Sequence, residues 1–319
     1  MQIVNYIMYF ILLTAAGILY ERYNSKFNDF DEIKQYELIK KYLLNESSLA
    51  SSKKPILWIH SKHDVNARNW ESFYSRNTEK INQPYIYLTM KSIIKHCSES
   101  FNICLIDDRS FSKLIPGWNI DIYHTADPIK SHLRQQAISK LLYFYGGMIV
   151  PNSFLCKQNL ISFYEDNIQP SPFICETIDR TVTSYKSVGF ANSSFMGCKK
   201  ADPVMKEMCE YLEKLGSTDY TSERDFTGEV NKWCYNKYMN TQMTLLSGRL
   251  IGTIDAKNEP VIIDNLLSEK YIHFDPNCCG IFIPADEILL RSKFAWFARQ
   301  SIDQVVQGGS VLAKHFVIS

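Results

Sequence analysis

The chain has 319 residues, of which 45% are hydrophobic, so it can bury a full core and is too long for a peptide-like or disulfide-framed module. The chain has 35 Lys and Arg against 34 Asp and Glu, a formal net charge of +1. A nearly neutral protein has no net electrostatic potential that would attract a highly charged partner, so we predict no nucleic-acid partner. The nine cysteines are scattered, mostly in apolar runs and without a CxxC pair, which favours buried thiols over a disulfide framework or a structural zinc site.

The first apolar segment, Ile3–Tyr20, carries no charged residue and meets the threshold of about 18 residues for a transmembrane helix. A cleaved signal peptide is the main alternative because residues 14–17 are small, yet no Lys or Arg precedes the apolar run. A buried core helix is disfavoured because the sequence turns polar at Glu21. We therefore predict a single-pass membrane protein anchored by residues 1–22, and the flanking charges leave its orientation open.

A polar region separates this segment from the globular part. Hydrophobic residues recur at helical spacing from Asn28 to Leu44 with Lys and Glu between them, a pattern typical of an amphipathic stalk. A Ser-rich stretch, Asn45–Lys54, follows and has the composition of a linker. We predict residues 23–54 to be stalk and linker and residues 55–319 to be one globular domain.

The globular part opens with a strand, a helix and a strand. Ile56–His60 is an apolar run of strand length, residues 86–97 repeat apolar side chains with the period of a half-buried helix, and Phe101–Ile106 is a second apolar run that stops at Asp107. This βαβ pattern predicts an α/β fold with a mostly parallel sheet flanked by helices.

The same order then repeats. A helical pattern over 129–145 ends at Gly146 and Gly147, a pair that indicates positive φ and a close backbone approach, and the strand Met148–Val150 follows. Right-handed βαβ units place the C-terminal ends of parallel strands on one side of a sheet. Asp107 and Asn152 should therefore lie at the same edge, where open α/β sheets bind ligands.

A later helix has capping signals at both ends. Asp202 is a favourable N-cap and Pro203 suits the first helical turn. We expect Gly216 to close the helix in the left-handed C′ position.

Three segments carry a family resemblance: PILWIHSKHDVNARNW (Pro55–Trp70), PYIYLTMKSIIKHCSESFNICLIDD (Pro84–Asp108) and SKLLYFYGGMIVPNSFLC (Ser139–Cys156). Together they resemble the capsular-polysaccharide-synthesis and related mannosyl-type, DxD-containing glycosyltransferases of the GT-A fold, and nothing matches after Cys198. The resemblance implies a GT-A-like fold, a nucleotide-sugar donor and sugar transfer. The stretch YGGMIVPNSF also resembles membrane proteins of large DNA viruses, which implies no function.

The chain departs from this family at its metal-binding motif. The family's strand after Gly-Gly delivers two carboxylates that hold Mg²⁺ or Mn²⁺, and here those positions are Pro151 and Ser153, with Asn152 between them. We therefore expect no metal site and no cofactor, unless another carboxylate replaces the motif and restores Mn²⁺ or Mg²⁺. The family's helix arginine falls at Ile138, one turn beyond Arg134.

The resemblance selects the candidate nucleotide-sugar-binding residues. They are Asp107, Asp108, Asn152, Ser153 and Arg134, with one of the acidic pair expected to face the uridine or guanosine ribose or to share a metal. The alternatives are a solvated turn at Asp107 and Asp108 and a merely structural turn at Asn152 and Ser153. The family also places an Asp beside its helix arginine, and whether Asp127 and Arg134 substitute for that pair stays open.

Catalytic candidates follow the run PFICE. Glu176 and Asp179 lie at or just beyond a strand end, where a carboxylate can act as a base or as a substitute ligand. His60 and His63 are candidate phosphate contacts, although single histidines are more often ordinary polar residues. Arg291 and Arg299 flank an aromatic stretch, FAWF, that we expect to pack as core, and a diphosphate clamp by either arginine is a weaker alternative.

Two functions of different classes fit these observations. The first is a membrane-anchored glycosyltransferase that passes a sugar from a nucleotide sugar to a glycan or lipid-linked acceptor by direct displacement, with a carboxylate as base. The second is a catalytically inactive GT-A-like scaffold that acts as an interaction protein at a membrane or particle surface. A soluble hydrolase lacks a nucleophile motif such as GxSxG. The missing acidic motif leaves enzymatic activity open.

Overall fold

The computed structural model describes residues 54–62, 83–122, 124–177, 190–217 and 223–319. The predicted anchor, stalk and most of the linker lie outside the described residues. The short segment Ser112–Ile120 groups apart from a larger unit made of Lys53–Phe111 and Asp121–Ser319. The sheet, its helices and the candidate site all belong to the larger unit.

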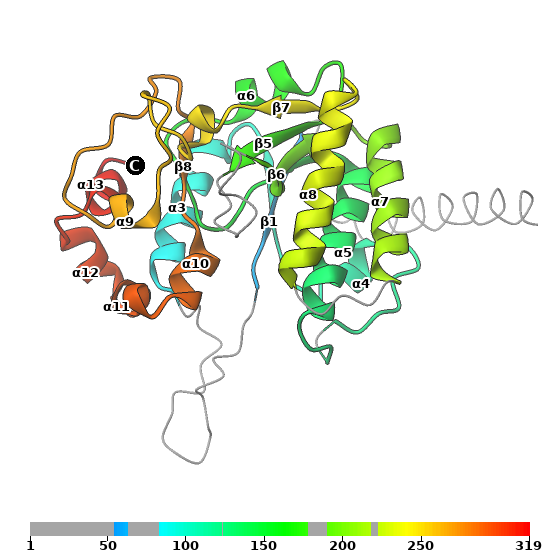
Figure 1. Cartoon of the computed structure of the whole chain (residues 1–319), viewed down its shortest axis with the longest axis horizontal. Helices are drawn as coiled ribbons and strands as arrows, with labels where there is room; N and C mark the ends of the chain where they lie inside the picture. The colour runs from blue at the N-terminus through cyan, green and yellow to red at the C-terminus, as the bar shows by residue number, and fades with distance from the viewer. Residues whose placement is uncertain (1–53, 63–82, 123, 178–189, 218–222) are drawn as a thin grey trace, which may run out of the picture. The chain divides into compact units, whose positions relative to one another are not determined.

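Six strands of the described chain form one sheet in the order β2-β1-β3-β6-β5-β7 (Figure 1). Their bounds are β1 Ile56–His60, β2 Asn102–Ile106, β3 Gly147–Ile149, β5 Phe173–Thr177, β6 Phe190–Cys198 and β7 Thr244–Leu246. β1 is parallel to β2 and β3, and β5 is parallel to β7, whereas β6 is antiparallel to both β3 and β5. The prediction of a mostly parallel sheet is confirmed.

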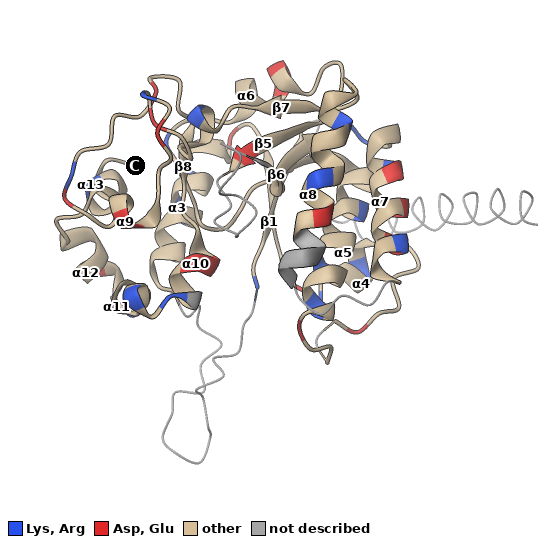
Figure 2. Cartoon of the chain, in the orientation of Figure 1, with Lys and Arg blue, Asp and Glu red and all other residues tan. Residues whose placement is uncertain are grey.

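Helices cover this sheet. α5 (Ile129–Tyr145) packs on α7 (Pro203–Gly216), and α8 (Glu223–Met239) packs on β6. Figure 1 shows these three helices together on one side of the sheet and α3 (Tyr85–Cys97) on the other. Figure 2 shows few charged residues on the strands and many on the helices. The arrangement is the helix-flanked α/β architecture that the sequence predicts.

A second, two-stranded sheet joins the middle of the chain to its C-terminal part. β4 (Phe154–Cys156) pairs antiparallel with β8 (Gly280–Phe282). Because side chains alternate along a strand, Phe154 and Cys156 enter the core of the large sheet while Leu155 enters a second core.

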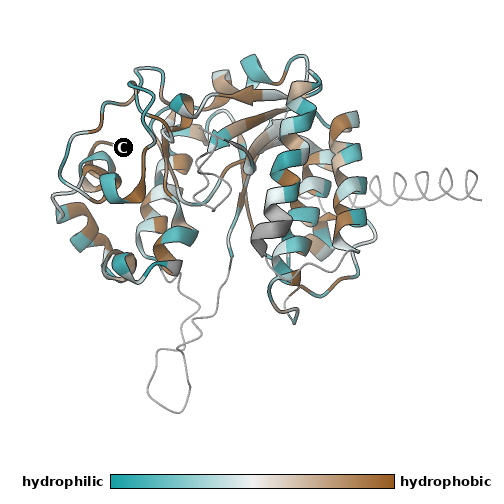
Figure 3. Ribbon diagram, viewed as in Figure 1, coloured by the Kyte–Doolittle hydropathy of each residue, from teal (hydrophilic) through white to brown (hydrophobic). Residues whose placement is uncertain are grey.

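The second core is built by α3 and a series of short C-terminal helices. These are α9 Ile263–Leu266, α10 Ala285–Leu290, α11 Ala295–Ala298, α12 Ile302–Gln307 and α13 Val311–Ile318. Tyr85 of α3 packs against Phe297 of α11 with the rings tilted and their centroids 5.0 Å apart, and both are buried. Figure 3 shows hydrophobic colour along the strands and both hydrophobic and hydrophilic colour on the helices, as burial of one helix face requires.

The Gly-Gly turn has the backbone geometry that its sequence predicts. Gly146 has φ +72° and Gly147 has φ +94°. A Cβ on Gly147 would lie 2.2 Å from the carbonyl oxygen of Ile56 on the neighbouring strand. Trp58 also donates from Nε1 to the carbonyl oxygen of Gly146, at 3.0 Å. Glycine is therefore required where α5 turns into β3.

The predicted start of α7 is confirmed, and its predicted end is wrong. The Asp202 carboxylate accepts from the amides of Val204 and Met205 at 2.9 and 3.2 Å, which confirms the N-cap. Gly216, expected in a left-handed C′ position, is instead the last helical residue, and Ser217 continues with φ −81°. The φ angle of Gly216 is not positive, because the helix continues through this residue.

Candidate functional site

The C-terminal ends of the parallel strands gather polar residues at one edge of the sheet. β1 ends at His60, β2 is followed by Asp107 and Asp108, and β3 is soon followed by Asn152. Because β1 pairs parallel with both β2 and β3, these ends lie on the same side. The prediction that Asp107 and Asn152 share an edge is confirmed, and this is the position at which open α/β sheets bind ligands.

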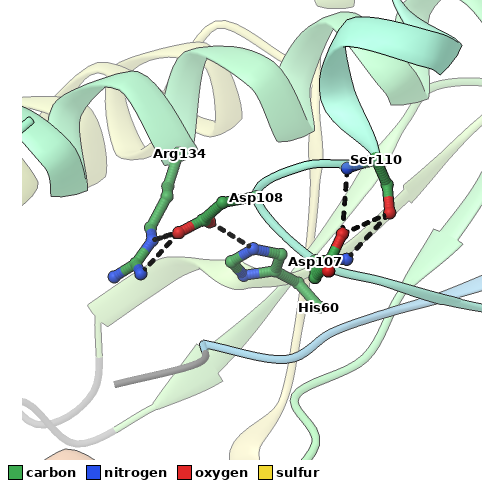
Figure 4. Close-up of polar contacts among 5 residues, drawn as sticks. All are labelled: His60, Asp107, Asp108, Ser110 and Arg134. Carbon is green, nitrogen blue, oxygen red and sulfur yellow. Dashed lines mark hydrogen bonds and ion pairs between the residues drawn. The ribbon is translucent and has the colours of Figure 1, made fainter. Parts of the chain in front are cut away.

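Asp108 is the centre of a buried polar cluster (Figure 4). Arg134 on α5 donates from Nε to Oδ1 at 2.9 Å and from Nη2 to Oδ2 at 2.7 Å, the two-pronged geometry that a guanidinium and a carboxylate prefer. His60 Nε2 lies 3.0 Å from Oδ1. The side chains of Arg134 and Asp108 are only 6% and 11% exposed. The cluster ties the ends of β1 and β2 to α5.

The ionisation of this cluster follows from its contacts. Burial alone would raise the pKa of Asp108, but hydrogen bonds from His60 and Arg134 and the guanidinium charge outweigh it and hold the pKa well below its usual range. Burial lowers the pKa of His60, and the bond to Asp108 offsets only part of that effect. Asp108 is therefore an anion, and neutral His60 carries its proton on Nε2 and donates it to that anion.

The lowered pKa of His60 predicts a loss of stability in mild acid. An unfolded histidine titrates near about 6.5, so below that pH the unfolded chain binds a proton that folded His60 does not. This contribution to stability is fully present above about pH 6.5 and falls as the pH drops, by up to about 1.4 kcal/mol per pH unit. In His60→Gln, whose amide can still donate to Asp108, denaturant titrations between about pH 5 and 7 should show a flatter profile than wild type. Equal slopes in the two proteins would contradict the assignment.

Asp107 has a different role from its neighbour. Its Oδ1 accepts from the amide of Ser110 at 2.9 Å and from the Ser110 hydroxyl at 2.6 Å, and that hydroxyl in turn accepts from the Asp107 amide at 3.1 Å (Figure 4). These bonds hold the turn after β2 and place the half-buried Asp107 carboxylate at the sheet edge. Asp108 is therefore part of the buried ion pair, whereas Asp107 holds the turn at the sheet edge.

The turn at Pro151, Asn152 and Ser153 is held by hydrogen bonds within the protein. Thr89 on α3 donates to the carbonyl oxygen of Asn152 at 2.5 Å, and the buried Ser153 hydroxyl donates to the carbonyl oxygen of Ile283 at 2.7 Å. Pro151 has no side-chain ligand atom, and the Ser153 oxygen is uncharged and already engaged. These residues do not fit Mg²⁺ or Mn²⁺, which prefer carboxylate ligands. Within the described ranges, no group of three His, Cys, Asp or Glu side chains is placed to hold a metal ion.

Glu176 lies near the end of β5 at this same edge, because β5 runs in the direction of β1. Its Oε2 accepts from the amide of Gly248 at 3.0 Å, and its carbonyl oxygen accepts from the Thr253 hydroxyl at 2.8 Å. These bonds attach the strand to the 3₁₀ turn η4 (Gly248–Ile251) and to Thr253 just after it, and the first fixes the direction of the carboxylate. Asp179, the second catalytic candidate, lies outside the described residues, as does His63.

Sequence reasoning missed two features of this edge. The role of His60 as a partner of Asp108 leaves no local signal, because 48 residues separate the two. Thr177, which ends β5, is 1% exposed and its hydroxyl has no hydrogen-bond partner in the described part of the chain. The weaker candidates lie elsewhere: Arg291 pairs with Glu287 and stacks over Phe294. In the FAWF stretch the two phenylalanines are buried as expected, whereas Trp296 is 52% exposed.

Comparison with known proteins gives distant structural likeness only. No family model and no curated protein matches the sequence. The apo form of the glycosyltransferase GlyE from Streptococcus pneumoniae TIGR4 matches with 12% identity and a TM-score of 0.34, over 62% of this chain and 46% of GlyE, so the match spans about half the length of that protein.

LgtC gives two further matches. An active-site mutant of LgtC aligns with 10% identity and a TM-score of 0.36, over 72% of this chain and 87% of LgtC. The galactosyltransferase LgtC in complex with donor and acceptor sugar analogues aligns with 12% identity and a TM-score of 0.35, over 76% and 92%. The chain is thus similar to glycosyltransferases.

Proposed function

We propose that this chain is a membrane-anchored, glycosyltransferase-like protein that binds a nucleotide sugar at the C-terminal edge of β1, β2 and β3. The observation that carries the proposal is the placement of Asp107, Asn152 and Glu176 at one edge of a mostly parallel sheet, next to a buried ion pair. Parallel α/β sheets bind ligands at this edge because loops from several strands converge there. The ion pair of Asp108 and Arg134 supports that edge by holding the end of β2 against α5.

Each residue has a chemical role in this proposal. The Asp107 carboxylate accepts hydrogen bonds from the ribose hydroxyls, and Asn152 offers an uncharged amide to the sugar or the phosphates. Arg134 acts through Asp108, since its charge is already shared with that carboxylate. Glu176, oriented by the Gly248 amide, or Asp179 takes the proton of the acceptor hydroxyl as that oxygen attacks the anomeric carbon. The acceptor is a glycan or a lipid-linked sugar.

The leaving diphosphate in this scheme is stabilised without a metal ion. The turn at Pro151 and Ser153 offers no carboxylate, so amide donors and basic side chains must supply the compensating interactions. We therefore propose metal-independent binding. The second candidate function is an inactive scaffold at a membrane or particle surface. It is favoured by the lack of a carboxylate in this turn and by the Ser153 hydroxyl, which donates to the Ile283 carbonyl oxygen.

Binding of a panel of uridine and guanosine diphosphate sugars to the full chain separates these functions. We expect affinity to be the same with a chelator and with Mn²⁺, and Asp107→Ala to weaken it about tenfold, the value of one good hydrogen bond to a charged group. The matched control is Asp275→Ala, whose carboxylate likewise accepts from an amide of its own turn, that of Asn277 at 2.9 Å. Affinity that rises steeply with Mn²⁺ would mean that another carboxylate rebuilds a metal site. No binding under either condition would favour the scaffold.

The membrane anchor is a separate part of the proposal. Every helix in the described ranges is too short or too polar to cross a bilayer, and Ile3–Tyr20 lies outside those ranges. We expect that deleting Met1 to Tyr20 moves the protein from the membrane pellet to the supernatant after alkaline carbonate washing, because that segment has the length and apolar character of a span. A truncated protein that stays in the pellet would contradict the anchor.

A further inference from the structure

A hollow of about 250 Å³ opens where α8 ends, on the edge of the sheet opposite the candidate site. β5 begins at Phe173 and β7 at Thr244, and both run in the direction of β1, so their first residues lie away from the ends of β1, β2 and β3. The lining residues, all uncharged, are Pro170, Ser171, Tyr238, Thr241, Met243, Thr244 and Leu245.

The wall of this hollow includes a strained residue. The amide of Thr241 donates to the carbonyl oxygen of Tyr238 and the amide of Gln242 to that of Lys237, both at 2.9 Å, the pattern of a helix that closes through a left-handed C′ residue. Thr241 occupies that position with φ +59°. Glycine adopts this conformation without penalty, whereas a β-branched residue is a backbone outlier. Strain of this kind persists only where the surrounding structure holds it, and it clusters at binding and active sites.

The chemistry of the lining combines an aromatic ring with hydroxyl groups. Tyr238 is 39% exposed, and its ring centroid lies 5.9 Å from that of Tyr235, itself 41% exposed. The hydroxyls of Ser171 and Thr244 lie 3.0 Å apart, so both point into the same region. Thr241 adds a third hydroxyl, which donates to the carbonyl oxygen of Asn240 at 2.7 Å and keeps its lone pairs for an incoming donor.

From these features we propose that the hollow binds one pyranose ring of a neutral glycan, with Tyr238 under the apolar C–H face of the sugar and Ser171, Thr241 and Thr244 at its hydroxyl rim. A sugar ring has one apolar face and a polar rim, which this lining complements. The volume lies below the range of about 300 to 1,000 Å³ that drug-sized ligands occupy, so one ring is accommodated. Tyr235 supports the next ring of the chain.

The same lining disfavours other ligand classes. A phosphate or a nucleotide needs cationic side chains or a helix N-terminus, whereas the described lining is uncharged and the helix meets the hollow with its C-terminal end. A fatty chain has no hydrogen-bonding groups for the lone pairs that the three hydroxyls present to the hollow. The proposed glycan site is independent of nucleotide-sugar binding at the opposite edge, so either can fail without the other.

Saturation-transfer NMR of the full chain with a panel of neutral oligosaccharides of glucose, galactose, mannose and N-acetylglucosamine tests this site. We expect at least one to bind, Tyr238→Ala to weaken that binding at least tenfold, and Tyr271→Ala to leave it unchanged. Tyr271 is the matched control because it is 83% exposed and contacts His273 instead. Asp107→Ala should also leave it unchanged, which separates this site from the nucleotide site.

Thr241→Gly provides the sharper comparison. Removing the strained side chain should raise the melting temperature of the protein while weakening saccharide binding several-fold, because stability and binding then depend on Thr241 in opposite directions. A higher melting temperature with unchanged saccharide binding would overturn the proposal, as would a panel in which no neutral saccharide binds or in which Tyr238→Ala binds like wild type.

Discussion

Gly147→Ala is expected to lower the free energy of unfolding by more than about 3 kcal/mol, enough to prevent folding of a marginally stable chain. Two costs add at this position. The backbone sits at φ +94°, which is strained for any residue with a Cβ, and the new Cβ would lie 2.2 Å from the Ile56 carbonyl oxygen. That oxygen belongs to backbone of the neighbouring strand β1, so relief requires the parallel pairing of β1 with β3 to shift.

Gly216→Ala is the control for this prediction. Gly216 is the last residue of α7, has no positive φ, and an added Cβ there would meet nothing within 4 Å. Alanine at such a helical position should raise stability by up to about 1 kcal/mol. Chemical denaturation of both variants measures the difference. If Gly147→Ala unfolds at the same denaturant concentration as wild type, the close approach at the Gly-Gly turn is not needed.

The strands around the candidate site were predictable because each is a short apolar run with a clear stop. Ile56–His60 is preceded by Pro55, and the run that became β2 stops at two aspartates. The Gly-Gly pair was equally informative because its geometry excludes side chains. Strong local signals of this kind survive in the folded chain since tertiary contacts agree with them.

The C-terminal third gave no comparable signal. After Met239, its α-helices are four to eight residues long, too short for a periodic pattern to build up. β4, with three residues, is also too short to show alternation, yet it divides its side chains between two cores. Such elements exist because tertiary packing supports them, which a local pattern cannot reveal.

Within the site, the sequence predicted the acidic pair but not the different roles of its two aspartates. Asp107 and Asp108 are neighbours, so the sequence treats them alike, whereas the fold turns one toward Arg134 and the other toward Ser110. The partners of Asp108 lie 26 residues after it and 48 residues before it. The sequence did indicate Arg134 as a candidate, although only the helix packing decides that it reaches Asp108.

Arg134→Met should cost about 3–5 kcal/mol, because it leaves the Asp108 carboxylate buried with only His60 as a partner. The double variant Asp108→Asn with Arg134→Met removes the uncompensated charge, so it should be more stable than Arg134→Met alone. Lys140→Met serves as the control: it breaks a 2.8 Å pair with Glu213 in which the two side chains are 20% and 49% exposed, and it should cost less than about 1 kcal/mol.

The pH dependence of the Arg134→Met effect follows from the depressed pKa of Asp108. A carboxylate whose folded pKa lies below its unfolded value of about 3.9 contributes stability that is present above that value and is lost as the pH falls through the folded pKa. The gap in stability between wild type and Arg134→Met should thus be constant near neutral pH and shrink in acid, beginning as the pH falls through the higher pKa that Asp108 has once the guanidinium is gone and burial dominates. Denaturant titrations across this range measure it. A cost no larger than that of Lys140→Met, or a gap that does not shrink in acid, would show that the ion pair is not the structural support of this sheet edge.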